Sequence, residues 1–217
     1  MTAALLADRR VLIRRSRRLN YATLGYNSLE GVLSVGAGLQ VGSIALVGFG
    51  ADSLIELAAG ITALWRLGAE LDPARQEHAE RRALRLIGLC FLALAAYVSL
   101  EGIRALVGGL PPERSSVGIG IAAASLLVMP FLARAKRTVA LRLGSGALAA
   151  EARQTLLCTY LSAILLGGLA LNALWGWWWA DPVAGLAMVP LIAWEGLEAI
   201  RGRSACGERC HPRPADC

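Results

Sequence analysis

The sequence predicts an all-α membrane protein, a bundle of six transmembrane helices with the N and C termini in the cytosol. Hydrophobic residues make up 56% of its 217 residues and charged residues only 18%, whereas about a quarter of the residues of a soluble domain are charged. The apolar residues lie in long runs, and a helical run of about 20 residues crosses a bilayer. Six such runs with short connections account for most of the chain, so we expect no separate soluble domain.

The positions of the basic residues predict the orientation of this bundle. The net charge is +6, and of the 22 Lys and Arg six lie within residues 9–18, five within 66–85, five within 134–153 and four after residue 200. These clusters fall in alternate connections, which is the positive-inside pattern of cytosolic loops. Topology thus explains the positive charge, and we expect no nucleic-acid partner.

The charge and hydropathy pattern divides the chain into three parts. Residues 1–18 are expected to be a basic cytosolic segment, 19–202 the transmembrane domain, and 203–217 a short cytosolic tail. The first two spans are expected at 19–40 and 43–67, with a tight turn between them.

The third span is expected to follow a polar cytosolic connection. Asp72 and Pro73 are typical of the N-cap and first residue of a helix. The charged residues that follow predict a short helix at the membrane surface that leads into the span. Gly108 and the Gly-Leu-Pro-Pro sequence after it are expected to end that span.

The last three spans complete the bundle. The fourth is expected at 116–133, with a kink near Pro130, and a basic loop should join it to the fifth at 150–174. The Trp-rich stretch after it is typical of an aromatic belt where a helix leaves the membrane. Asp181 and Pro182 are expected to form the cap and first turn of the sixth span.

Two acids in the second span are candidate metal ligands. Asp52 and Glu56 are four residues apart and therefore lie on one helical face. A charge in mid-membrane costs a few kcal/mol, and two close carboxylates repel each other unless a proton or cation lies between them. A divalent ion suits such a pair. The alternative is a pair of protonated acids that hydrogen-bond to neighbouring helices.

The fifth span offers a second pair at the same spacing, Gln154 and Cys158. A thiolate is a strong ligand for zinc and for softer ions, whereas an amide carbonyl is a weak one. A buried Cys is also common as a small hydrophobic residue. The residues of this pair alone therefore leave both interpretations open.

Other polar residues in the spans are possible supporting groups. Asn27 and Glu30 share a helical face with Ser34, and the nearby Gly31 and Gly38 would allow close helix packing. Asn27 and Glu30 are candidates for a proton relay or for hydrogen bonds to metal ligands, and a structural hydrogen bond is the alternative.

Two further acid-containing pairs lie in the third and sixth spans. Glu101 and Arg104 are expected to pair with each other. Glu195 and Glu198 lie one turn apart near the cytosolic side, and a solvated helix end is the better interpretation for Glu198.

The tail contains Cys206, Cys210, His211 and Cys217, residue types that bind zinc or copper. Their spacing matches no standard zinc module, so this is a weak candidate site, and a disordered tail is the alternative. The sequence contains no phosphate-binding loop, catalytic triad or nucleotide motif. We therefore do not expect an enzyme.

Three stretches resemble the cation diffusion facilitator family. Ser43–Glu56, with the sequence SIALVGFGADSLIE, is similar to the second span of that family. Glu151–Gln154 followed by Cys158 resembles its fifth span, and Trp178–Pro182 resembles the start of its sixth. Order and spacing match over roughly residues 19–202, and short members that resemble TMEM-type zinc transporters are the most similar.

The resemblance implies a six-helix bundle that works as a homodimer in the lipid bilayer. Arg outnumbers Lys 21 to 1, which indicates a bacterial genome composition, so we expect the cytoplasmic membrane of a bacterium. Carried over, the family's transport site is Asp52, Glu56, Gln154 and Cys158. Members usually export Zn²⁺, and some export Mn²⁺, Fe²⁺, Co²⁺ or Cd²⁺, in exchange for protons. The implied metal is thus a transported ion, and no permanently bound cofactor is expected.

The sequence departs from the family pattern in two places. The usual fifth-span residues are His or Asp followed by Asp, whereas here they are Gln154 and Cys158. Most members also carry a cytosolic metal-sensing domain after the sixth span, and here about fifteen residues follow it.

The resulting hypothesis is a proton-coupled divalent-metal exporter. Two alternatives stay open. One is a non-transporting metal sensor or partner subunit with a degenerate site. The other is a transporter of a different solute that uses Glu30 and Glu101.

Overall fold

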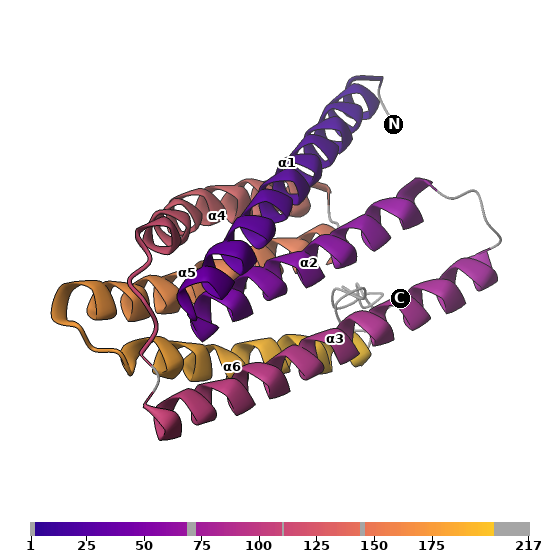
Figure 1. Cartoon of the computed structure of the whole chain (residues 1–217). Coiled ribbons are helices and arrows are strands. Elements are labelled where there is room, and N and C mark those ends of the chain that lie inside the picture. The colour runs from indigo at the N-terminus through magenta and orange to yellow at the C-terminus, as the bar shows by residue number, and fades with distance from the viewer. Residues whose placement is uncertain (1–2, 69–72, 110, 144–145, 202–217) are drawn as a thin grey trace, which may run out of the picture.

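Six long helices run back and forth in one bundle, as Figure 1 shows. The computed structural model describes residues 3–68, 73–109, 111–143 and 146–201, and the side chains of 11–62, 82–109, 111–143, 148–149 and 151–201. The helices are α1 (Ala3–Val41), α2 (Ile44–Gly68), α3 (Pro73–Gly108), α4 (Ser116–Leu143), α5 (Gly146–Trp175) and α6 (Ala180–Ile200). No strand occurs within the described ranges, so the all-α class is confirmed.

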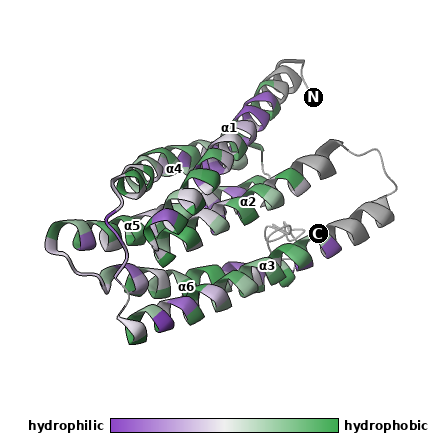
Figure 2. Ribbon diagram, in the orientation of Figure 1, coloured by the Kyte–Doolittle hydropathy of each residue, from purple (hydrophilic) through white to green (hydrophobic). Residues whose placement is uncertain are grey.

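Five of the six helices are long and apolar enough to cross a membrane. Their apolar parts are 44–62 in α2, 82–108 in α3, 116–143 in α4, 151–175 in α5 and 180–200 in α6. Figure 2 shows this apolar character along most of the bundle and hydrophilic residues in the coloured part of α1 nearest its N-terminus. The sixth crossing, by α1, and the cytosolic position of both termini remain predictions.

Several helices are longer than the sequence predicted. The basic segment expected before the first span is helical from Ala3 onward and continuous with α1. The basic loop expected after the fourth span is part of α4, which runs to Leu143. The surface helix and the third span form one helix, α3, which begins at Pro73 as predicted, while Asp72 lies outside the described residues.

The helix extensions have a packing reason. A small apolar cluster packs these extensions together. It consists of Leu12 of α1, Val139 and Ala140 of α4, and Leu148 of α5. Arg, Ala and Leu are also strong helix formers. The helices therefore continue past their apolar spans while they still bury a shared face.

The sharp turns lie where the sequence placed them. Gly42, Gly109 and Gly176 have φ of 70°, 61° and 68°, a left-handed conformation that glycine adopts without a steric penalty. The turn after α5 carries exposed tryptophans, and the rings of Trp177 and Trp179 stack with centroids 5.2 Å apart. Exposed aromatic side chains at a helix end fit the expected membrane-interface belt.

Helix α2 is central, because it contacts α1, α3, α5 and α6. The approach of α1 is close: a Cβ atom on Gly31 would lie 2.7 Å from Leu54, and one on Gly50 would lie 2.7 Å from the backbone nitrogen of Val35. Gly38 is equally tight, 2.8 Å from the backbone nitrogen of Val47. The expected close packing at Gly31 and Gly38 is thus confirmed, and it brings the polar face of α1 against α2.

Asp181 caps a different helix from the one expected. The N-cap of α6 is Trp179, which makes no side-chain capping hydrogen bond. Asp181 instead accepts hydrogen bonds from the Ser43 hydroxyl at 2.5 Å and from the Ile44 backbone N–H at 3.0 Å. The first N–H groups of a helix have no intrahelical acceptor, and Asp181 supplies one to α2 across the bundle. Pro182 lies in the first turn of α6 as predicted.

This contact predicts a loss of stability in Asp181→Ala. The substitution leaves the Ile44 N–H and the Ser43 hydroxyl without their buried acceptor, which should cost about 1–3 kcal/mol. In a protein of this size that corresponds to a fall in Tm of about 2–4 °C per kcal/mol, measurable by thermal unfolding in detergent. Glu113→Ala, which removes an exposed acid near the same turn, is the control. Equal Tm values for the two variants would contradict the role of Asp181.

Candidate metal site

Three predicted ligands meet at the contact between α2 and α5. One ligand atom each of Asp52, Glu56 and Cys158 lies within 4.8 Å of those of the other two. Their exposed fractions are 0%, 7% and 0%. The four-residue spacing places both acids on the inward face of α2, and α5 brings Cys158 to that face. The structure therefore brings together both ligands predicted on α2, Asp52 and Glu56, and one of the two predicted on α5, Cys158.

Three of the four carboxyl oxygens in this cluster lack hydrogen-bond donors among the described residues. The Cys158 thiol donates to Glu56 Oε2 at 3.5 Å. Both oxygens of Asp52 and Oε1 of Glu56 have no hydrogen-bond partner within the described part of the chain. A buried charge without a partner is costly, so these carboxyl groups need protons or a cation. A cation that binds here would replace the missing donors.

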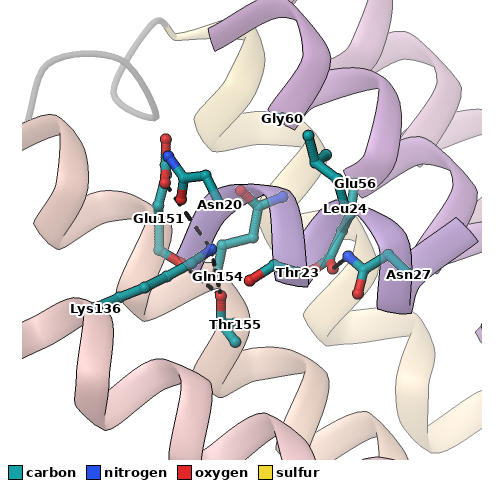
Figure 3. Close-up of a pocket in the computed structure, with 10 residues that line it drawn as sticks. All are labelled: Asn20, Thr23, Leu24, Asn27, Glu56, Gly60, Lys136, Glu151, Gln154 and Thr155. Atoms are coloured by element: carbon teal, nitrogen blue, oxygen red, sulfur yellow. Dashed lines mark hydrogen bonds and ion pairs between the residues drawn. The ribbon is translucent and has the colours of Figure 1, made fainter. Parts of the chain in front are cut away.

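Gln154 lies one helical turn before Cys158 and lines a cavity of about 40 Å³ together with Glu56. Figure 3 shows Gln154, Glu56 and Asn27 around this cavity. A tetrahedral zinc site takes four ligands, of which Asp52, Glu56 and Cys158 would supply three. Gln154, which lines the adjacent cavity, stays the predicted fourth ligand.

Helix α1 forms one hydrogen bond to Glu56 and one to Ser53, the residue that follows Asp52. Asn27 Nδ2 donates to Glu56 Oε2 at 3.0 Å. The hydroxyl of Ser53, the residue after Asp52, donates to Glu30 Oε2 at 3.0 Å. Such outer hydrogen bonds orient metal ligands in known sites. Asn27 thus touches a candidate ligand directly, whereas Glu30 contacts the residue next to one.

Lys136 is a buried cation that the sequence analysis placed in a loop. It is 4% exposed, its Nζ lies 3.9 Å from Glu151 Oε2, and it donates to the Thr155 hydroxyl at 3.3 Å. Figure 3 shows this pair at the cavity that Glu56 and Gln154 line. The signal was available in the helical spacing of α4, since Ser125, Met129 and Ala133 lead to Lys136 on one buried stripe.

Glu195 of α6 is a second group whose position the sequence did not predict. It is 8% exposed, and neither carboxyl oxygen has a hydrogen-bond partner in the described residues. It lies close enough to Asp52 and Glu56 for their charges to interact. The only sequence signal for Glu195 as a functional residue was its position within an apolar span, one turn before Glu198.

Two sets of sequence candidates remain, the Glu101–Arg104 pair and the residues of the tail. Glu101 and Arg104 pair with each other on α3, with 2.6 Å between Glu101 Oε1 and Arg104 Nη1, as predicted. The tail residues Cys206, Cys210, His211 and Cys217 lie outside the described residues, so the tail site stays a prediction.

Comparisons with known proteins agree on a transport family. A sequence model described as the cation efflux transmembrane domain matches residues 22–203. An uncharacterized transporter of Synechocystis sp. is 27% identical over 175 residues, which cover 78% of this chain and 56% of that protein. The cation-efflux pump FieF of Yersinia pestis is 28% identical over 195 residues, which cover 84% of this chain and 63% of the pump. The chain thus spans less than two thirds of the length of these relatives.

The cluster predicts that Cys158 binds a soft metal ion. Cadmium added to the purified chain should produce thiolate-to-cadmium charge-transfer absorption in the ultraviolet, because thiolates favour soft ions. Cys158→Ser should abolish most of this absorption. A variant with Cys206, Cys210 and Cys217 all changed to Ser is the control and should retain it. Absorption that follows the tail cysteines instead would show that the cluster does not bind the ion.

Proposed function

The chain belongs to the cation diffusion facilitator family, and from that premise we propose that it exports a divalent metal ion, Zn²⁺ first of all, in exchange for protons. The proposed location is the cytoplasmic membrane of a bacterium, with the basic helix ends on the cytosolic side. As in the family resemblance, the proposed working unit is a homodimer. The observation that carries this proposal is the buried cluster of Asp52, Glu56 and Cys158.

The donor set favours a borderline or soft ion. Two carboxylates and one thiolate suit Zn²⁺ and Cd²⁺ better than Mn²⁺, which prefers oxygen ligands. Gln154 is neutral and contributes at most a carbonyl oxygen. We therefore propose Asp52, Glu56 and Cys158 as the strong ligands and Gln154 as the weak fourth one.

Competition between metal and protons would couple the two fluxes. Carboxylates and thiols must lose their protons to bind a metal ion. On the cytosolic side a metal ion would displace these protons. After rearrangement of the helices, protons from the other side would displace the metal. The hydrogen bond from Asn27 to Glu56 would hold one ligand in position during this exchange.

The contacts disfavour a transporter of another solute that uses Glu30 and Glu101. Glu101 is paired with Arg104 at 2.6 Å, and Glu30 accepts a hydrogen bond from Ser53. The weak ligand Gln154 is the feature that favours a non-transporting sensor or partner subunit. Transport measurements separate that alternative from the proposal.

Zinc flux should depend on both Asp52 and a proton gradient. In proteoliposomes under an imposed pH gradient, the wild type should move Zn²⁺ above the rate of empty liposomes. Asp52→Asn removes a proposed direct ligand. Its loss of flux should therefore exceed the loss of about 10–100-fold that is typical when a residue hydrogen-bonded to a ligand is changed. Glu101→Gln is the control, because that acid lies away from the cluster, and it should keep wild-type flux.

Each other outcome has a distinct meaning. Zinc flux that is unchanged in Asp52→Asn would overturn the site. Flux without a gradient dependence would overturn proton coupling. An absence of flux for Zn²⁺, Mn²⁺, Fe²⁺, Co²⁺ and Cd²⁺ would favour the sensor or partner-subunit alternative.

Asn27→Ala should weaken metal binding without abolishing it. The substitution removes the hydrogen bond to Glu56 Oε2 but no ligand, so the Kd for Zn²⁺ should rise about 10-fold. Isothermal titration of the purified chain measures this change. Ser28→Ala is the matched control, because that hydroxyl bonds only within its own helix, to the Leu24 carbonyl. An unchanged Kd in Asn27→Ala would show that Asn27 does not position the ligand.

A further inference from the structure

A second cavity lies between α2, α3, α5 and α6, separate from the one in Figure 3. Its volume is about 80 Å³, and Glu195 lines it together with Gln154, Glu198, Ile87 and Phe91. It is larger than the space that a single water molecule requires. The cavity therefore has room for an ion that keeps part of its hydration shell.

We propose that Glu195 is the anchor of a second divalent-cation site in this cavity, which holds a partly hydrated ion next to the Asp52–Glu56–Cys158 cluster. The inference rests on the proposed transport of divalent cations and adds an access route to it. An ion would bind first at Glu195 and then pass to the cluster.

The burial of Glu195 carries the first step of the argument. The residue is 8% exposed, and both of its carboxyl oxygens lack hydrogen-bond partners in the part of the chain that the structure describes. A buried polar group normally has a partner, and a buried carboxylate without one is costly. Glu195 lines a cavity that has room for the missing partner, and a rotation of its covered carboxyl group into that cavity would let a cation with its water molecules bind both oxygens.

The chemistry of the lining selects the ligand. Glu195 and Glu198 offer carboxylate oxygens and Gln154 offers an amide oxygen, while Ile87 and Phe91 supply apolar walls. Oxygen donors with water suit hard and borderline divalent ions. Apolar walls lower the local dielectric constant and so strengthen the attraction between the ion and Glu195.

The two cavities differ in how their basic residue is placed. Each has one basic and two acidic residues in its lining: Lys136, Glu56 and Glu151 in the cavity of Figure 3, and Arg153, Glu195 and Glu198 in the second. The Lys136 side chain is 4% exposed, so its charge acts on a cation through a medium of low dielectric constant. Arg153 is exposed, and solvent screens its charge. The repulsion of a cation is therefore weaker in the second cavity.

Gln154 connects the two sites. It lines the second cavity beside Glu195 and the first cavity beside Glu56. A neutral amide oxygen binds a metal ion weakly, so it can contact an ion at either site without retaining it. This position gives the unusual Gln a role in transfer between Glu195 and the cluster.

Equilibrium binding of Mn²⁺ to the purified full chain tests the proposal. Mn²⁺ is the probe because it prefers oxygen ligands, and the second cavity offers oxygen donors only. The same preference reduces the binding of Mn²⁺ by the tail cysteines. Asp52→Asn should retain one Mn²⁺ per chain, bound at Glu195. The double variant Asp52→Asn with Glu195→Gln should lose that ion. Asp52→Asn combined with Glu113→Gln, an exposed acid remote from both cavities, is the matched control and should keep it.

Zinc uptake provides the second measurement. Glu195→Gln should raise the half-saturating Zn²⁺ concentration about 10-fold and leave the maximal rate less affected, because the cluster itself is intact. Equal Mn²⁺ binding by Asp52→Asn and by the double variant with Glu195→Gln would overturn the second site. A Glu195→Gln variant that takes up zinc with the same half-saturating concentration and maximal rate as the wild type would also overturn it. An absence of uptake by the wild type would instead contradict the proposed function, while the Mn²⁺ measurement would still decide the Glu195 site.

Discussion

The rest of this structure depends on the burial of three carboxyl groups, those of Asp52, Glu56 and Glu195, within an apolar helix bundle. Removal of such groups from water is costly unless a proton, a hydrogen-bond donor or a cation compensates them. Asn27 and Cys158 donate to one oxygen of Glu56, and the other five oxygens of these groups have no donor among the described residues. That deficit of donors is the physical property that suits the protein to a mobile cation.

The helix packing delivers these groups to one place. Glycines bring α1 close enough to α2 for Asn27 to contact Glu56. At one end of the bundle Asp181 of α6 caps α2 through Ser43 and Ile44, which holds these two helices together. The two cavities lie toward the other end, which carries the basic residues and where a small apolar cluster joins α1, α4 and α5.

The charges on the two sides of the α2–α5 contact differ in kind. On the α1 and α4 side, the buried Lys136 lies 3.9 Å from the partly exposed Glu151, which places an ammonium group at the cavity that Glu56 lines. On the α3 and α6 side, Glu195 has no such partner among the described residues. A buried ammonium group makes the first side less favourable for a mobile cation than the second. The asymmetry supports one direction of approach to the cluster and assigns different roles to two buried charges.

The sequence by itself determined the helical class, the turns at glycine and the pairing of Asp52 with Glu56, because hydropathy, φ preference and helical periodicity are local properties. It also pointed to Cys158 and Gln154 through their matching four-residue spacing. Tertiary structure alone decided that Asp181 caps α2, that Lys136 is buried against Glu151, and that Glu195 lines a cavity beside the cluster. Each of these depends on which helices are neighbours, and contacts between residues far apart in the chain leave no periodic signal in it.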